Sequence, residues 1–444
     1  MKTPRYDVAI VGARCAGAAL AAFLARRGAR VVVLERAPLH SEHVLSTHQI
    51  HPPGIRVLDE LGVGDAVRAV APGADVVRLA KDDADIDIRL PDGLTERCPR
   101  RDRLDGLLQD AAVEAGAELR ERCTVTGVAM RDGRARGVRF EGPNGVEETL
   151  EADLVVGADG RHSTVAACVE AEEYLGYDAP RALYWTYFQA PPLWSDDAAY
   201  PFGMYVGRRG ASIRTVFHTD HDQLLLGSVP PLAEVERSWR GDPEGTLLAD
   251  LRGDPVVGPL VEAAGPPLEP VRATFRERYF FRRAAGPGWL LVGDAGHHKD
   301  FVLGDGISEA LVQARSAAGV IAEGGDRALE RWWRERDVEA LPLYFLGRDE
   351  GSPEPFPELR RVVMRQVARR RDLRQRMFRS VNRELPADQV FSPLQILGWA
   401  LRAALSGRFG VLGDFVTMAR QGARDSAEIG RRRRLLERLE PSRA

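Results

Sequence analysis

The sequence has few of the features that mark metal centres, disulfide scaffolds or membrane spans. Its 444 residues contain only four cysteines, none of them in a CxxC pair, at positions Cys15, Cys98, Cys123 and Cys168. No cysteine–histidine cluster has zinc-site spacing, so we expect no metal and four reduced thiols in a cytoplasmic protein. No apolar run reaches the roughly 20 residues that cross a bilayer, so we expect no integral membrane segment.

Lysine is also scarce, and the numbers of positive and negative side chains are nearly equal. Only three lysines occur, and the formal net charge is −3. Nucleic-acid binding usually requires a strong basic excess, so we expect no nucleic acid as partner. The oligomeric state stays open. The apolar stretch Leu394–Leu405 is too short to span a membrane. We interpret it as core, with a membrane-surface helix as the alternative.

The N-terminal segment predicts a βαβ unit. Tyr6–Val11 has the pattern of a short buried strand, Ala18–Arg27 is rich in the helix formers Ala and Leu, and Val31–Leu34 is a second buried strand. Parallel strands need such a crossover helix between them. The unit therefore predicts a doubly wound, Rossmann-like layer at the start of the chain.

The turn between the first strand and the helix has the features of a phosphate-binding loop. It reads Gly12-Ala-Arg-Cys-Ala-Gly17. Gly12 permits a tight turn, Gly17 allows close packing of helix and strand, and a helix amino end attracts a pyrophosphate. Arg14 replaces the usual middle glycine. Glu35, at the end of the second strand, can accept hydrogen bonds from a ribose, so the unit favours nucleotide binding.

Two further Gly-Asp segments follow predicted strands. Gly157-Ala-Asp-Gly160 comes after a buried strand at Leu154–Val156. Gly293-Asp-Ala-Gly296 comes after Trp289–Val292, and Gly304-Asp-Gly306 then opens a predicted helix. Alone, Gly157–Gly160 has the composition of an ordinary turn, because turns use Gly and Asp constantly. The third segment alone is moderately specific, since an aspartate at a strand end that faces a helix amino end can bind polyols.

Together and in this order, the three segments resemble the FAD-dependent aromatic hydroxylases with the p-hydroxybenzoate hydroxylase fold, the group A flavoprotein monooxygenases. The resemblance covers roughly residues 5 to 325. It implies an α/β fold with a Rossmann-like FAD-binding domain, an inserted, mostly antiparallel β-sheet substrate domain and a helical C-terminal region. On this basis residues 1–75, 99–180 and 271–345 form the FAD-binding domain, 76–98 and 181–270 the substrate domain, and 346–444 the helical region.

The resemblance also assigns cofactor-binding residues along the chain. The implied FAD contacts are the pyrophosphate residues Gly12, Arg14, Ala16 and Gly17, Glu35 at the ribose with its neighbour Arg36, Arg101 at a helix start, Val125 at the adenine, Asp159, Asp294 at the ribityl and pyrophosphate region, and Gly306 and Ile307 beside the flavin ring. Here Asp305 stands where the family usually has a glutamine, so an acid comes close to the flavin.

The implied reaction is monooxygenation. NAD(P)H would reduce FAD, dioxygen would form a flavin C4a-hydroperoxide, and this would oxygenate an aromatic or polyketide-like molecule. The altered loop also resembles prenyl-reductase relatives. A carbon–carbon reductase or dehydrogenase therefore stays an alternative, and a non-catalytic flavin-binding protein is the third hypothesis.

Residues that contact the substrate are less well marked by the sequence. The aromatic candidates for the pocket wall are Trp185, Tyr187, Tyr205 and Phe217, although aromatic residues in strands more often serve sheet packing. His48 is the candidate catalytic residue, because the segment after the ribose acid passes beside the flavin in this family and histidine suits proton transfer. A loop histidine that caps a backbone carbonyl is the structural alternative.

Overall fold

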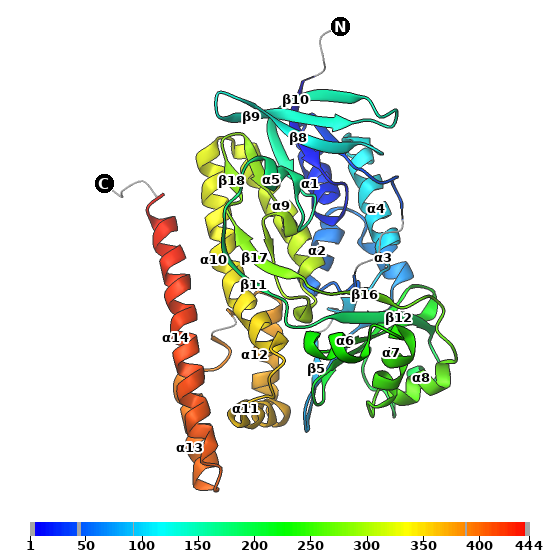
Figure 1. Cartoon of the computed structure of the whole chain (residues 1–444), viewed down its shortest axis with the longest axis vertical. Helices are drawn as coiled ribbons and strands as arrows, with labels where there is room; N and C mark the ends of the chain where they lie inside the picture. Colours follow the sequence, from blue (N-terminus) through cyan, green and yellow to red (C-terminus); the bar gives the residue numbers. More distant parts are fainter. Residues whose placement is uncertain (1–4, 42–45, 92, 387–388, 440–444) are drawn as a thin grey trace.

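The computed structural model describes residues 5–41, 46–91, 93–386 and 389–439. Two large β-sheets lie one above the other in Figure 1, with the N-terminal helices around the upper sheet and a group of C-terminal helices along one side. The mixed α/β architecture expected from the sequence is therefore present.

The upper sheet carries the βαβ unit. Its order is β18-β19-β10-β1-β2-β7, and β1 pairs in parallel with both β10 and β2. Helices α1, α4 and α9 cover it, which is why β1 and β2 are apolar along nearly their whole length. The bounds are β1 (Tyr6–Val11), α1 (Cys15–Ala25), β2 (Val31–Leu34), α4 (Arg101–Glu114), β7 (Glu118–Arg120), β10 (Glu147–Gly157), β18 (Ala285–Gly286), β19 (Trp289–Leu291) and α9 (Gly306–Glu323).

A hairpin extends from the upper sheet. Strand β8 (Thr124–Arg131) pairs with β9 (Arg134–Glu141), which in turn pairs with β10. Asp132 and Gly133 form the turn with positive φ angles of 51° and 74°. Two positive φ angles are what a tight type I′ turn requires, and an Asp-Gly pair is a sequence that favours such a turn.

The lower sheet has seven strands in the order β16-β12-β15-β14-β13-β4-β5, and all its pairs are antiparallel except β13 with β4. One face packs on helix α11 and on the loop that precedes α9; the other packs on helices α6 to α8. The bounds are β4 (Val76–Lys81), β5 (Ala84–Arg89), β12 (Leu183–Gln189), β13 (Met204–Arg208), β14 (Ile213–Thr219), β15 (Gln223–Val229), α6 (Leu232–Ser238), α7 (Pro243–Arg252), α8 (Gly258–Ala264) and β16 (Arg272–Thr274).

Short elements connect the two sheets. Strand β17 pairs with β11 on one side and β20 on the other, and β3 pairs with β6. Their bounds, with the remaining short helices, are α2 (Pro52–Glu60), α3 (Gly64–Val70), β3 (Gly73–Ala74), β6 (Glu96–Arg97), α5 (Thr164–Cys168), β11 (Glu173–Asp178), η1 (Pro192–Ser195), η2 (Asp220–Asp222), β17 (Arg278–Arg282), η3 (Gly293–Ala295), β20 (His297–His298) and η4 (Phe301–Leu303).

The last quarter of the described chain is helical, as the sequence indicates. Its helices are α10 (Asp326–Gly351), α11 (Glu358–Arg369), α12 (Arg371–Val381), α13 (Pro393–Leu405) and α14 (Gly410–Glu437). Helix α14 runs along α10, and α11 covers the sheet edge at β5 (Figure 1). The segment 76–98 contributes β4 and β5 to the same sheet as strands from residues 181–270. The division of the chain into domains stays a prediction.

The buried guanidinium of Arg181 joins the lower sheet to the end of α10. It donates four hydrogen bonds of 2.7 to 2.9 Å to the carbonyl oxygens of Gly351, Ser352, Ala211 and Val229. Buried carbonyl groups that lose their donors are costly, because no water replaces the lost bonds.

We therefore expect Arg181→Met to lower the free energy of unfolding by roughly 3 kcal/mol or more, since several buried acceptors lose their partner together. Chemical denaturation of the variant and the parent protein measures this change. Arg30→Met is the matched control, because it breaks only an exposed pair with Asp7 that is worth about 1 kcal/mol at most. Equal losses in both variants would show that the Arg181 bonds are not structural.

Candidate functional site

The turn at Gly12 brings three chain segments into contact. The Gly12 N–H donates to the Leu34 carbonyl at 2.8 Å, and its φ is +98°. A Cβ at Gly12 would lie 2.6 Å from the Ala158 carbonyl oxygen, and a Cβ at Gly17 would lie 1.9 Å from the Gly12 carbonyl oxygen. Neither distance can accommodate a side chain, so both glycines allow the helix, the first strand and the second Gly-Asp segment to meet.

The amino end of α1 is free to hold an anion. Its N-cap residue, Arg14, has an extended backbone with φ −98° and makes no side-chain cap hydrogen bond. The first amide groups of a helix have no partners within the helix, so an uncapped start leaves donors and a positive dipole end for a ligand. The negative φ also explains why arginine is tolerated where the motif usually has glycine.

Glu35 is buried at the end of β2, beside that turn. Its carboxylate accepts hydrogen bonds from the Ala13 N–H at 2.8 Å and the Ala37 N–H at 3.0 Å, which fix its orientation. Its backbone carbonyl accepts from the Cys123 N–H, so the start of β8, which carries Val125, lies alongside. Arg36 is exposed next to Glu35. The predicted ribose and adenine contacts are thus neighbours.

Arg101 starts helix α4 and faces the same region. It forms an ion pair with Asp105 at 2.9 Å, and the Cys15 thiol of α1 donates to the same carboxylate at 3.2 Å. The negative charges of Asp105 and Asp294 raise the pKa of Arg101, although its burial opposes this. Arg101, α1 and the third Gly-Asp segment therefore converge although they are far apart in sequence.

Asp159 has one carboxylate oxygen in use and one without a partner. Oδ2 accepts from the Thr164 and Val165 amides at 2.7 and 3.2 Å, which caps helix α5. Oδ1 is buried and has no hydrogen-bond partner within the described residues. Burial raises the pKa of this carboxyl group. An unpaired buried acceptor of this kind usually indicates an absent ligand or water.

The amino end of α9 is a second uncapped helix start beside the first. Gly293 packs on α1, where an added Cβ would lie 3.1 Å from the Ala16 Cβ, and a Cβ at Gly306 would meet no atom within 4 Å. The N-cap residue of α9, Asp305, makes no side-chain cap hydrogen bond with the helix, and Ile307 is buried. Open space in front of free helix amides fits a carbonyl-rich ring such as a flavin.

A buried cluster of four charges neutralises the unusual acid in this loop. The Lys299 ammonium lies 2.5 Å from the Asp305 carboxylate and also contacts Glu309. Arg383, from the helical C-terminal region, donates to Asp305 at 2.9 Å and to Glu309 at 2.6 Å. The sequence gives no signal for Arg383, because its partners lie more than 70 residues away.

His48 lies in the wall between this region and the lower sheet. Its Nε2 is 2.5 Å from the Tyr187 hydroxyl, both side chains are buried, and its φ is +67°. Its Nδ1 is buried with no hydrogen-bond partner within the described residues. Burial, and then the charges of Arg101, Arg100 and Arg272, lower the pKa of His48 well below its usual value. A strained backbone at a buried, half-satisfied histidine is typical of a functional position.

The inner face of the lower sheet carries three of the four predicted substrate residues. Trp185, Tyr187 and Phe217 share this face. Phe217 borders a narrow cavity of about 30 Å³ whose lining is Thr47, Gln49, Leu183, Val206, Ile213, Thr215, Phe217, Val229, Phe301, Val302 and Gly304. The hydroxyl of Thr215 is buried there without a hydrogen-bond partner.

Tyr205 does not join them, which corrects its assignment to the pocket wall. It lies on the opposite face of the sheet, and its hydroxyl is 3.2 Å from the Asp254 carboxylate. Side chains alternate between the two faces of a strand, so Val206 rather than Tyr205 reaches the narrow cavity. The aromatic character of Tyr205 alone could not reveal which face it occupies.

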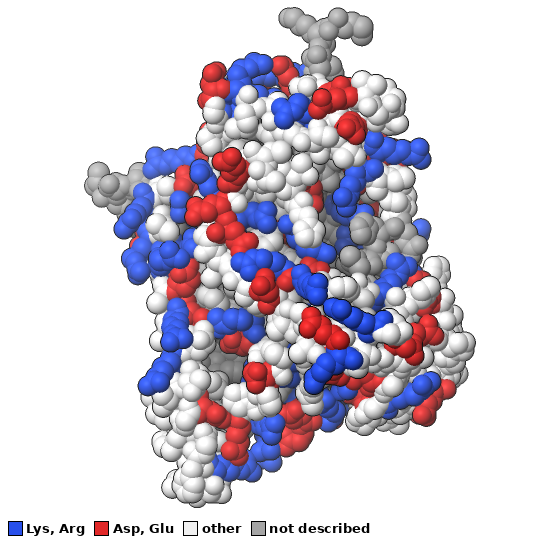
Figure 2. Space-filling view, in the orientation of Figure 1, with Lys and Arg blue, Asp and Glu red and all other residues white. Residues whose placement is uncertain are grey.

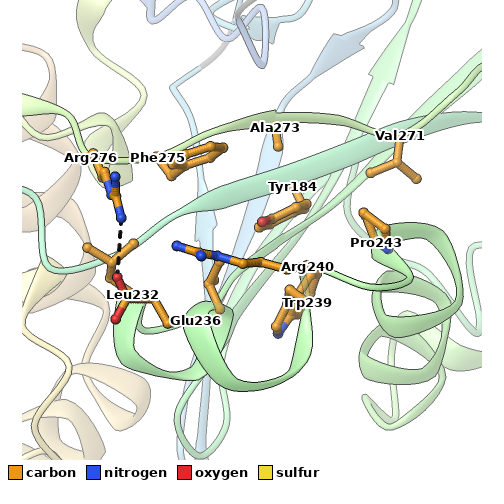
Figure 3. Close-up of a pocket in the computed structure, with 11 residues that line it drawn as sticks. Tyr184, Leu232, Glu236, Trp239, Arg240, Pro243, Val271, Ala273, Phe275 and Arg276 are labelled. Atoms are coloured by element: carbon orange, nitrogen blue, oxygen red, sulfur yellow. Dashed lines mark ion pairs between the residues drawn. The ribbon is translucent and has the colours of Figure 1, made fainter.

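A larger cavity of about 270 Å³ lies on that opposite face (Figure 3). Tyr184 and Trp239 line it, with ring centroids 4.5 Å apart, and Phe275 lies across from Tyr184. An ion pair of 3.6 Å between Arg276 and Glu236 closes one side. None of the predicted cofactor residues borders this cavity, so its size alone does not make it the reaction site.

Within the described part of the chain, no group of three or more His, Cys, Asp or Glu side chains could hold a metal ion. Nor is any described helix both long and apolar enough to cross a membrane. The candidate site fits one extended dinucleotide better than a metal ion. Its residues are those at the two helix starts, together with Glu35, Arg101 and the unpaired Asp159 oxygen.

Comparisons with known proteins point to the same ligand. A family model described as FAD binding domain matches residues 5–328. The chain is 30% identical over 336 residues to 3-amino-4-hydroxybenzoate 2-monooxygenase of Streptomyces cremeus, covering 71% of this chain and 78% of that protein. It is 26% identical over 344 residues to digeranylgeranylglycerophospholipid reductase 2 of Methanopyrus kandleri, covering 72% and 77%. The solved complex of aklavinone-11 hydroxylase with FAD and aklavinone superposes with a TM-score of 0.63 at 24% identity, covering 78% of this chain and 68% of that chain.

We expect Gly17→Ala to abolish or strongly weaken FAD binding, because its new methyl group must push α1 away from the Gly12 carbonyl. The flavin absorbance of the purified protein, and its recovery after FAD is added, measure the change. Gly319→Ala in α9 is the matched control, since a Cβ there meets no atom within 4 Å. Normal flavin content in both variants would show that the amino end of α1 does not bind FAD.

Proposed function

The chain belongs to the FAD-dependent monooxygenase family that the FAD binding domain defines, and from this premise we propose that it oxygenates an aromatic or polyketide-like small molecule with NAD(P)H and dioxygen. The residues from the two helix starts and Glu35 would hold the FAD along its length. Bound FAD would supply electron transfer and oxygen activation. The protein residues would bind, orient and deprotonate the substrate.

The buried pair of His48 and Tyr187 is the observation that carries the proposal. Burial raises the pKa of Tyr187 to about 12, and burial together with nearby arginines lowers the pKa of His48. Both side chains are therefore uncharged near neutral pH. A neutral histidine with a free ring nitrogen can accept a proton from a bound phenol, and an ionised phenol is the more electron-rich substrate for oxygenation.

The arginines around the pair would stabilise the resulting anion. The Arg100 guanidinium lies 4.2 Å from the centroid of the Tyr187 ring, and it is held by Glu269. The positive charge of Arg272 also reaches His48. Charges already in place near a developing anion stabilise it without reorganisation. We infer that these arginines favour a substrate that loses a proton on binding.

The narrow cavity of about 30 Å³ would have to widen for such a substrate. Its outer wall includes Phe301, Val302 and Gly304, which come from the loop before α9 rather than from the sheet. A short loop can be displaced at less cost than strands paired on both sides. We therefore place the substrate between this loop and Phe217 on the sheet.

Reduction of a carbon–carbon bond is the second candidate function. Its support is the likeness to a phospholipid reductase and the buried Lys299–Asp305 pair in the loop where the hydroxylases usually have a different sequence. The two functions differ in their need for oxygen, because a reductase turns over anaerobically.

We expect His48→Gln to lower kcat/KM for substrate oxygenation by about 100-fold, because general-base catalysis contributes about that much or more. Flavin content should not change, since His48 is not among the predicted FAD contacts. The native enzyme should keep its activity from pH 8 to below pH 6.5 and lose it only at more acidic pH, where His48 finally gains a proton. That acidic loss should vanish in His48→Gln. An unchanged kcat/KM and pH profile in the variant would show that His48 is not the general base.

We expect NAD(P)H oxidation to be stimulated by small phenolic aromatic acids and polyketide-like phenols, with one dioxygen consumed per oxygenated product. An oxygen electrode and mass spectrometry of the product measure this ratio. Substrate conversion under strictly anaerobic conditions would contradict oxygenation and favour the reductase. Flavin binding without turnover under either condition would favour the non-catalytic hypothesis.

A further inference from the structure

The hairpin of α13 and α14 carries a group of exposed apolar side chains along the outer face of α13 and around the turn to α14, here named the apolar tip. It consists of Leu394, Leu401, Leu405, Phe409, Leu412 and Val416. Leu405 is 89% exposed, Leu394 80% and Phe409 73%. The hairpin is drawn at the lower left of Figure 1, and its end is mostly white in Figure 2. Grouped exposure of large apolar residues marks an interaction surface, whereas scattered residues do not.

The leucines of the tip lie on one face of α13, and the opposite face of this helix packs against the rest of the protein. In α13, Leu394, Leu401 and Leu405 recur at helical spacing on the outside. Trp399 and Ala403 lie on the buried side and pack in the core with α11 and α14. The interpretation of Leu394–Leu405 as core is thus correct for only half of the helix, since its leucine face packs on nothing described.

Within the hairpin segment that carries the tip, most charges are positive. From Pro393 to Arg424 the chain carries four arginines and one acid, Asp414. The Asp414 carboxylate accepts the Leu359 N–H at 3.1 Å, so it is already engaged. Arg402 and Arg408 flank the leucines, and Arg408 lies 3.7 Å from Glu358, with both side chains nearly half exposed. An apolar face bordered by arginines is complementary to a negatively charged surface with an apolar layer beneath it.

We propose that the apolar tip docks the protein on an anionic lipid surface. The leucines and Phe409 would enter the boundary of the acyl chains, and Arg402 and Arg408 would contact the phosphate groups. A second copy of the chain fits less well. A two-fold contact between two tips would bring their arginines together, and the tip offers no free acid to pair with them.

The geometry also favours a lipid surface over a protein partner. The turn between α13 and α14 protrudes at the end of a two-helix hairpin (Figure 1), and the exposed side chains lie around it and along one face of α13. A stable protein interface buries about 800 Å² on each partner, which normally requires a broad and complementary surface. Insertion into lipid needs no shape complementarity, only apolar side chains at a protruding end.

The test is co-sedimentation of the full-length protein with bound FAD and vesicles. Vesicles of phosphatidylcholine with phosphatidylglycerol supply the anionic surface, and pure phosphatidylcholine vesicles are the comparison. We expect the double variant Leu405→Ser/Phe409→Ser to reduce binding at least 10-fold. The double variant Arg402→Gln/Arg408→Gln should remove the preference for the anionic vesicles.

The control is Leu268→Ser/Phe275→Ser, which changes a leucine and a phenylalanine that are 49% and 51% exposed elsewhere on the surface. It should bind vesicles like the parent protein, and flavin absorbance should confirm that all variants are folded. No binding by the parent protein, or equal binding by the tip variant, would overturn the proposal. So would a dimer in light scattering that the tip variant dissociates, because a second copy would then be the occupant.

Discussion

The approach of α1 to the first strand and to the segment after β10 is the constraint on which the site depends. It is possible only because Gly12 and Gly17 carry no side chain: a Cβ at Gly17 would lie 1.9 Å from a backbone oxygen. This approach puts the uncapped amino end of α1 beside Glu35, Asp159 and Gly293, although these residues span most of the FAD-binding domain. A dinucleotide can then be bound along a row of residues from separate segments, each adding a donor or an acceptor.

Buried charge on the flavin side of the site is balanced, not avoided. Asp305 would be costly near a flavin if it stood alone, because an unpaired buried charge loses its hydration. Lys299 and Arg383 compensate it, and Arg383 connects the loop to the helical C-terminal region. The loop that forms the outer wall of the narrow cavity is thereby contacted by one residue, Arg383, outside the family match, which ends at residue 328. A substitution of Arg383 would therefore change the charge balance of this loop.

The elements that carry the candidate cofactor residues could be predicted from the sequence, whereas the sheet face that each candidate substrate residue occupies could not. The βαβ unit, the hairpin at Asp132-Gly133 and the helix at Gly306 follow from local patterns, because turn residues and periodicity act over a few positions. Tyr205 shows the limit: its aromatic ring suggested a pocket wall, whereas its register places it against Asp254 on the other face. The pairing of Arg383 with Asp305 and that of His48 with Tyr187 join residues more than 70 positions apart, which no local pattern indicates.

The central claim is that segments from four parts of the chain enclose one FAD. X-ray diffraction from crystals of the protein grown with FAD tests it most directly. The account predicts pyrophosphate density at the start of α1, within hydrogen-bond distance of the amides near Ala16 and Gly17, and the isoalloxazine ring beside Gly306 and Ile307. FAD density in another place, such as the cavity bordered by Tyr184 and Trp239, or none at saturating FAD, would contradict it.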